Sequence, residues 1–293
     1  MLHRLLFTSF TLLTAIATSA SADTPLKALI LTGQNNHDWK LTTPLLEKAL
    51  ADTGLFTVDI AVSPPKGGDM STFRPNFSDY AVVISNYTGD TWPAETKSAF
   101  VDYVRKGGGF VVVHSASNAF PDWPEYNAIC GLGGWEGRNE RWGPWIYWDQ
   151  KIIRDLSPGK GGDHGPVHAF TIDVRETDHP ITHGLPSRFA HAADELYNRL
   201  RGPAENLTVL ATAHDKPVAP ASSGRHEPIL FTVTYGTGRV FHTTLGHVRG
   251  DPTAMRSVAF IATFQRGAEW AATGKVTQQL PSDFPDASSP RLR

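Results

Sequence analysis

The sequence contains a single cysteine and almost no net charge. Cys130 has no partner in the chain, so an internal disulfide is excluded. The formal net charge is −2 and residues of both signs are mixed along the chain, so the sequence predicts neither a nucleic-acid surface nor an acidic tail. Beyond the amino terminus, no apolar run is long enough to span a membrane. An apolar core must therefore stabilise the protein.

Length and composition are those of a globular protein with many loops. The 293 residues suffice for one large domain or two small ones, and the 40% apolar content can fill a substantial core. The 26 glycines and 21 prolines predict many turns. The eight tryptophans offer flat surfaces that suit sugar rings.

The amino terminus has the pattern of a secretory signal peptide. Arg4 gives a positive start, an apolar stretch runs from Leu5 to Ala17, and Ala20-Ser21-Ala22 is a small-x-small cleavage site. No cysteine lies near this site, which argues against a lipid anchor. We assign residues 1–22 to the signal peptide and expect a periplasmic or secreted protein.

Apolar runs alternate with amphipathic stretches in the first half of the mature chain. The sequence predicts strands at 27–31, 56–62, 80–85 and 110–113, and helices that start near Pro44 and Pro93. Continuously apolar strands separated by helices indicate a mainly parallel sheet with helices on both faces. Residues 23–274 are therefore predicted to form one α/β domain.

The second half is less regular. Residues 123–165 show little periodicity, and so long an irregular stretch is usually functional. Further strands are predicted at 170–174, 207–211, 229–234 and 239–245, with a tight hairpin turn between the last two. A closing helix is predicted over 252–270, and the tail, residues 275–293, is expected to be loose.

Polar residues follow several predicted strands. In an open parallel sheet, ligands bind beyond the carboxyl ends of the strands. The candidates there for substrate contacts or chemistry are Asn36, His37, Asp38, Trp39, Asn86, Tyr87, His114, Ser115 and His247. Imidazoles that converge at one edge serve as metal ligands or as proton carriers. We assign His37, His114 and His247 as candidate ligands of a divalent metal such as zinc, while each alone also fits a structural role.

Two further groups of residues are candidates. Asp194, Glu195 and Tyr197 could act as acid or base or bind sugar hydroxyls, but the two carboxylates equally fit the start of a helix. Trp135, Trp142 and His164 lie in the irregular stretch and are assigned to substrate binding.

Several motifs occur in the order known from one family. They are Gly107–Ser115, Asp178–Ile181 with Gly184–Pro186, Asp194–Tyr197, and Gly238–Phe241 with Leu245–His247. With these motifs the chain resembles the trehalose-utilisation (ThuA-like) family over residues 26–273. The resemblance implies the flavodoxin-like fold of class I glutamine amidotransferases and a link to disaccharide use. Amidotransferases carry a nucleophilic cysteine at the turn where this chain has His114 and Ser115, so glutamine hydrolysis is not expected. Cys130 is interpreted as a small buried residue.

Three functions remain open from the sequence. The first is an enzyme that acts on a glycoside or an oxidised (keto) disaccharide, with His114 or His247 as base and Tyr197 or a metal stabilising the developing oxygen charge. The second is a sugar-binding module without turnover. The third is a hydrolase with Ser115 as nucleophile and His247 as its base, although no Gly-x-Ser-x-Gly elbow surrounds Ser115. A carbohydrate is the expected partner, no nucleotide cofactor is expected, and the oligomeric state is left open.

Export gives the first testable prediction. We expect cleavage after Ala22, so the mature protein should begin at Asp23. Amino-terminal sequencing of protein purified from its native host checks this. Native protein that still begins with Met1 would contradict it.

Overall fold

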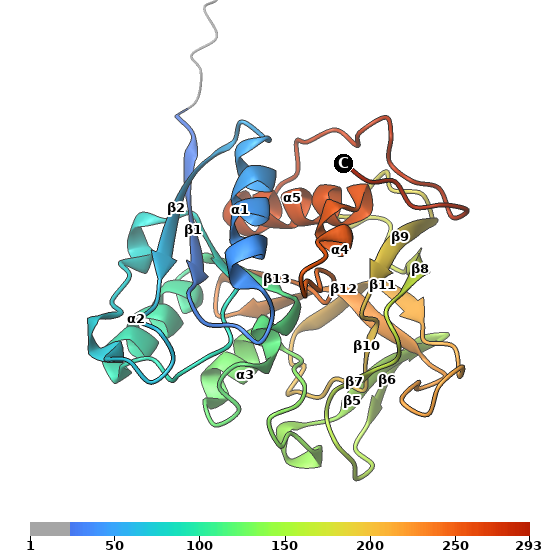
Figure 1. Ribbon diagram of the computed structural model, residues 1–293, viewed down its shortest axis with the longest axis horizontal. Coiled ribbons are helices and arrows are strands. Elements are labelled where there is room, and N and C mark those ends of the chain that lie inside the picture. Colours follow the sequence, from blue (N-terminus) through green and yellow to red (C-terminus); the bar gives the residue numbers. More distant parts are fainter. Residues whose placement is uncertain (1–23) are drawn as a thin grey trace, which may run out of the picture.

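The computed structural model describes residues 24–293, so the predicted signal peptide lies outside the described residues. Its centre is a mixed sheet in the order β2-β1-β3-β4-β13-β12-β11-β8-β9 (Figure 1). The first five strands are parallel: β2 (Phe56–Val62), β1 (Leu26–Thr32), β3 (Val82–Ser85), β4 (Gly109–Val113) and β13 (Gly238–Thr243). The rest are antiparallel: β12 (His226–Tyr235), β11 (Leu207–His214), β8 (His168–Val174) and β9 (Arg188–Asp194).

Helices cover both faces of the parallel half. The helices are α1 (Trp39–Ala51), α2 (Ala94–Arg105), α3 (Pro124–Cys130), α4 (Thr253–Arg256) and α5 (Val258–Thr273). Side chains alternate between the faces along each strand, as the pleat requires. Val111 and Val113 pack with α1 and α5, whereas Phe110 and Val112 pack with α2 and α3. The fold is the predicted flavodoxin-like sheet. Its central strands are rich in β-branched residues and are buried on both faces, as is usual for parallel strands.

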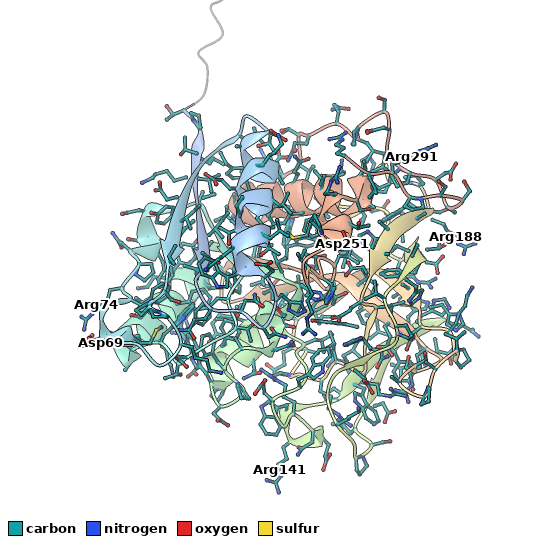
Figure 2. All side chains as sticks on the ribbon, viewed as in Figure 1. Asp69, Arg74, Arg141, Arg188, Asp251 and Arg291 are labelled. Atoms are coloured by element: carbon teal, nitrogen blue, oxygen red, sulfur yellow. The ribbon has the colours of Figure 1, made fainter. Side chains whose placement is uncertain are left out.

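Many charged residues lie on the molecular surface. Figure 2 shows Arg74, Arg141 and Arg188 at the periphery of the molecule, where all three side chains are exposed. Cys130 is buried, and burial raises the pKa of its thiol to about 12. No described helix is long and apolar enough to cross a membrane.

The stretch 123–165 contains more regular structure than the sequence predicted. Helix α3 lies there, followed by the strands β5 (Trp145–Asp149), β6 (Lys151–Asp155) and β7 (Asp163–His164). β5 pairs with β6 and also with β12, where Trp148 lies opposite His226, whereas β7 pairs with β10 (Tyr197–Asn198). β7 has only two residues and its partner lies outside the stretch, so periodicity within the stretch could not identify it.

Helix α1 begins five residues before its predicted start at Pro44. Asn86 Nδ2 donates to the hydroxyls of Thr42 and Thr43, and Thr43 Oγ1 lies 2.8 Å from Thr32 Oγ1. These buried contacts fix the first turns of the helix and outweigh the preference of proline for a first position.

The predicted closing helix is broken, and the tail is packed rather than loose. Ser257 separates α4 from α5 with an extended backbone, and it forms a bridge with Leu292. Val258 N donates to Arg291 O, and Phe284 packs on Phe189. The tail therefore adds a layer over the carboxyl-terminal helices, visible in red in Figure 1.

A buried carboxyl group gives a prediction about stability. Burial, with a smaller contribution from Asp215, raises the pKa of Glu227 to about 7, although its Oε2 accepts a hydrogen bond from Arg199 N. The unfolded chain releases this proton near pH ~4.3, so the stabilisation is complete below that pH and is lost as the pH rises through 7. Glu227→Gln should therefore raise the free energy of unfolding by on the order of 1–3 kcal/mol at pH 8 and change it little at pH 4.

Urea unfolding at both pH values checks this expectation, with Glu205→Gln, a change at an exposed carboxylate, as the control. A Glu227→Gln protein that is less stable than the wild type at pH 8 would show that the charged form is the stabilising one.

Candidate functional site

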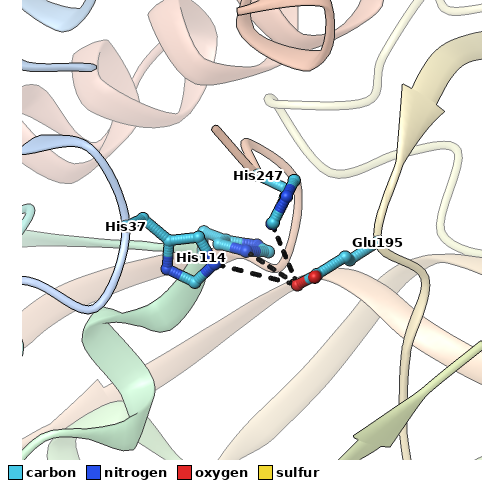
Figure 3. Close-up of side chains that lie close together, drawn as sticks. All are labelled: His37, His114, Glu195 and His247. Atoms are coloured by element: carbon cyan, nitrogen blue, oxygen red, sulfur yellow. Dashed lines mark ion pairs between the residues drawn. The ribbon is translucent and has the colours of Figure 1, made fainter. Parts of the chain in front are cut away.

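Four side chains converge at the carboxyl edge of the sheet. His37 lies in the loop after β1, His114 directly follows β4, His247 follows β13, and Glu195 follows β9 (Figure 3). Each offers one ligand atom, and these atoms all lie within 4.8 Å of one another. Three of the four thus come from the parallel half of the sheet, and the carboxylate comes from the antiparallel half.

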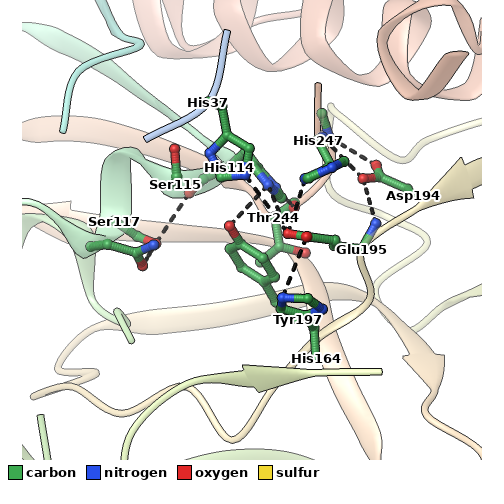
Figure 4. Close-up of polar contacts among 12 residues, drawn as sticks. His37, His114, Ser115, Ser117, His164, Asp194, Glu195, Tyr197, Thr244 and His247 are labelled. Carbon is green, nitrogen blue, oxygen red and sulfur yellow. Dashed lines mark hydrogen bonds and ion pairs between the residues drawn. The ribbon is translucent and has the colours of Figure 1, made fainter. Parts of the chain in front are cut away.

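Glu195 lies at the centre of the group. Its Oε2 is 3.1 Å from His247 Nδ1, 3.5 Å from His114 Nε2 and 3.8 Å from His37 Nε2. Its Oε1 is 3.3 Å from Nε2 of a fourth histidine, His164 (Figure 4). Burial alone would raise the pKa of Glu195, but its close contacts with His114, His247 and His37 hold it far below its usual value. The carboxylate is therefore ionised.

His114 is held by contacts to both ring nitrogens. Its Nδ1 lies 2.6 Å from the carbonyl oxygen of Thr244, so this nitrogen carries the proton and donates it. In the neutral ring, Nε2 then has a free lone pair, which accepts a hydrogen bond from Tyr197 Oη at 2.9 Å. The φ of His114 is 49°, a left-handed value that is unusual for a residue other than glycine. This sharp turn lifts the imidazole out of the strand and into the site.

Asp194 is a structural carboxylate rather than a group that faces a substrate. It is fully buried, and its two oxygens accept four hydrogen bonds, from Glu195 N, His247 N, Gly246 N and His191 Nε2. These use the whole acceptor capacity of a carboxylate. The interpretation of Asp194 as a catalytic residue is therefore replaced by a positioning role. The alternative of a helix start is wrong, because Asp194 ends β9.

His37 is positioned by the loop that precedes α1. Its backbone N donates to Asn35 Oδ1, and Asp38 N donates to Val248 O, which joins this loop to the one that carries His247. Burial lowers the pKa of His37 to about 4, so the ring is neutral at physiological pH. Its Nδ1 is buried and has no hydrogen-bond partner among the described residues.

The four groups fit a divalent metal ion. Three imidazoles and one carboxylate are a donor set that zinc and similar ions prefer. Tetrahedral zinc with ligands at ~2.0–2.1 Å places those ligands about 3.4 Å apart. The three distances from Glu195 Oε2 to histidine nitrogens, 3.1, 3.5 and 3.8 Å, bracket this value. The Thr244 carbonyl that orients His114 is the kind of outer contact that metal-binding histidines make.

Comparison with known proteins agrees with the motifs in the sequence. Residues 27–271 match the family described as trehalose utilisation (ThuA). The chain belongs to this family. The crystal structure of a ThuA-like protein from Parabacteroides merdae shares 48% sequence identity and superposes with a TM-score of 0.90, covering 92% of this chain and 98% of that one.

A second ThuA-like protein, from Bacteroides uniformis, shares 19% identity at a TM-score of 0.58, with 89% of this chain and 96% of that chain covered. That likeness shows the fold alone. No curated protein matches the chain.

Two adjoining cavities lie beside the histidines. The inner cavity, of about 220 Å³, is lined by Asn36, His37, Thr88, Asn118, Trp135, Glu136, His164, Glu195, Tyr197 and Arg249. The outer cavity, of about 580 Å³, is lined in part by Asn36, Trp39, Lys40, Lys66, Asp90 and Glu136. Of the predicted substrate contacts, Asn36, Trp135 and His164 thus line the inner cavity, and Trp39 lines the outer one.

The other predicted substrate contacts lie outside both cavities. Asn86 bonds to the threonines of α1, and buried Tyr87 donates to Asp90 O. Ser115 is buried, and its hydroxyl donates to Asn35 Oδ1. Trp142 donates to Pro121 O, and Asp38 is exposed at the start of α1. These five residues support the loops around the site or face solvent.

Glu136 and Arg249 were missed by sequence reasoning, although both line the inner cavity. Each lies in a loop with no motif of its own, so only the folded chain brings it to the histidines. Thr88 was missed for the same reason, and its hydroxyl donates to Ser115 O at 2.6 Å.

The geometry predicts metal binding. Purified protein should contain about one zinc or similar divalent ion per chain, and His37→Ala, His114→Ala and His247→Ala should each lower the metal content at least tenfold. Elemental analysis after dialysis measures this. His183→Ala, at an exposed histidine, is the matched control and should retain the ion. Wild-type protein that takes up no ion even from zinc-supplemented buffer would exclude the ligand role.

Proposed function

We propose that this ThuA-family protein is an exported enzyme of carbohydrate catabolism. It acts on a glycoside or an oxidised (keto) disaccharide with the help of a divalent metal ion held by His37, His114, His247 and Glu195. The observation that supports this most directly is the convergence of these four side chains, whose ligand atoms lie within 4.8 Å of one another, two of them (His37 and Glu195) in the wall of the inner cavity. The family description, trehalose utilisation, supports a sugar as the substrate.

The metal would supply a positive charge that polarises a substrate carbonyl and stabilises an enolate. Removal of the proton on the neighbouring carbon then requires a base that is not a ligand. His164 meets this requirement, because it lines the inner cavity and its Nδ1 lies 2.8 Å from the carbonyl oxygen of Gly165. That contact places the ring proton on Nδ1 and leaves the lone pair of Nε2 available. The assignment moves the base from His114 or His247 to His164.

The proposed step is an elimination. His164 Nε2 takes the proton from the carbon beside the carbonyl, and the electron pair of that C–H bond forms a carbon–carbon double bond. The C–O bond to the leaving sugar breaks, and its oxygen takes a proton from solvent in the open cavity. Tyr197 remains protonated, since burial raises its pKa well above the usual value. Its hydroxyl donates to His114 Nε2 in the structure, and it would be released to donate to the reacting oxygen if that nitrogen bound the metal.

The two other functions have less support. A hydrolase with Ser115 as nucleophile needs a free hydroxyl paired with a histidine. Ser115 instead donates to Asn35 Oδ1 and is 1% exposed. A sugar-binding module would use the same cavities, and only an assay of turnover separates it from an enzyme.

The roles assigned to the site predict losses of activity. His164→Ala should lower turnover about a hundredfold or more, the usual scale for loss of an acid–base group. His247→Ala and Glu195→Gln should lower it at least as much, because each removes a ligand of the metal. His164→Ala should retain its metal, whereas His247→Ala should lose it. The assay follows release of reducing sugar and formation of an enone from a panel of disaccharides and their keto derivatives, with His183→Ala as the control.

Three outcomes would contradict this proposal. Tight sugar binding without turnover across the panel would establish the binding module instead. Full activity of His164→Ala would exclude it as the base. Labelling of Ser115 by a fluorophosphonate, with loss of activity, would favour the serine hydrolase.

A further inference from the structure

The two cavities beside the histidines form one continuous depression. They share Asn36, Thr88, Asn118 and Glu136 as lining residues, so the inner cavity opens into the outer one. The volumes differ, at about 220 Å³ for the inner and about 580 Å³ for the outer. Binding pockets for small molecules usually measure ~300–1,000 Å³. The inner cavity alone is therefore too small for a complete ligand of that class, and a bound ligand would extend into the outer one.

The residues that could take part in chemistry line one cavity and not the other. His37, Glu195, His164 and Tyr197 line only the inner cavity. The outer cavity contains none of these groups and has the indole of Trp39 on its wall. The reacting part of a ligand thus belongs in the inner cavity, and the outer cavity binds a part that does not react.

The outer cavity suits a neutral hydroxylated ring. Its charged lining residues are Lys40, Lys66, Asp90 and Glu136, two of each sign, so a polyanion gains no net attraction. Asp90 Oδ2 is occupied by the backbone N of Gly67, which leaves the two lysines and Glu136 to meet polar groups of a ligand. An aromatic wall beside mixed donors and acceptors is the usual composition of a sugar site.

The boundary between the cavities is a fixed turn. Trp135 and Glu136 have φ values of 56° and 47°, and Arg138 N closes the turn on Trp135 O. Arg138 is buried, and its guanidinium donates to the carbonyl oxygens of Asn118 and Ala119 as well as that of Gly134. Trp135 lines only the inner cavity, whereas Glu136 lines both. This turn is therefore held in a position to contact both halves of a two-part ligand.

We propose that the outer cavity is the subsite that binds the second, leaving sugar ring of the substrate. The reacting ring then lies in the inner cavity, the glycosidic bond lies beside the four shared residues, and Trp39 and Lys66 contact the leaving ring. This inference rests on the function proposed above and adds the place where the leaving ring binds.

The test compares two ligands that share the reacting ring: a keto-disaccharide and the methyl glycoside of the same keto sugar. The wild type should bind the keto-disaccharide at least tenfold more tightly in calorimetry. Trp39→Ala and Lys66→Ala should each weaken that binding about five- to tenfold and leave binding of the methyl glycoside within about twofold, because only the disaccharide reaches the outer cavity. Trp148→Ala, at a tryptophan that lines neither cavity, is the matched control and should change neither affinity.

Trp39 lies two residues from His37, so Trp39→Ala could weaken binding by disturbing the metal site. Lys66→Ala tests the same cavity at a residue farther along the chain from His37. Metal content is measured for both variants. Equal affinity of the wild type for both ligands, or equal weakening of both by Lys66→Ala, would overturn the subsite. Selective binding of the disaccharide without turnover would support the subsite and refute the proposed enzyme. Turnover of both ligands with equal affinity would support the proposed enzyme and refute the subsite. Failure to bind either ligand would refute both the enzyme and the subsite.

Discussion

The candidate site depends on one buried carboxylate, that of Asp194. A fully buried charge is tolerated only when it is well compensated. Here four N–H groups provide that compensation, and two of them belong to Gly246 and His247, more than fifty residues along the chain. Burial alone would raise the pKa of Asp194, but the hydrogen bond and charge of His191, with further help from His114 and Gly246 N, keep it below its usual value. The same residue precedes Glu195, so one set of contacts places both Glu195 and His247.

The two halves of the sheet contribute different parts of the site. Parallel strands end at one edge, and the loops after β1, β4 and β13 therefore deliver three histidines to one place. The antiparallel half adds Glu195 after β9 and Tyr197 in β10, and β7 adds His164 by pairing with β10. The parallel half alone would thus contribute the three histidines but not the Glu195 carboxylate that lies between them.

The sequence was sufficient to predict the parallel half of the fold, because each strand is a short apolar run between turn residues. It was also sufficient to place His37, His114 and His247 at one edge, since that edge follows from the parallel order. The sequence could not show whether an individual side chain faces the cavity or packs against a helix. Asn86 lies against α1 instead of in the cavity, because its amide donates to the hydroxyls of Thr42 and Thr43.

The antiparallel half was harder to predict for a different reason. The two-residue strands β7 and β10 have no periodicity, and each exists only because the other lies beside it. β9 was likewise not predicted, and the roles of Asp194 and Glu195 could not be separated from the sequence. Only the folded chain shows that one carboxylate faces four N–H groups while its neighbour faces four histidines.

The turn after β4 shows how one backbone feature can serve different chemistry. In the amidotransferases that the fold resembles, this turn presents a cysteine nucleophile. In this chain, the turn keeps a left-handed residue, but His114 occupies it, with Nδ1 bonded to Thr244 O and Nε2 directed toward Tyr197 and Glu195. Cys130 is buried elsewhere, and its raised pKa keeps it a thiol. The strained turn therefore directs a ring nitrogen toward Tyr197 and the carboxylate of Glu195, and it presents no thiol that could form a covalent thioester.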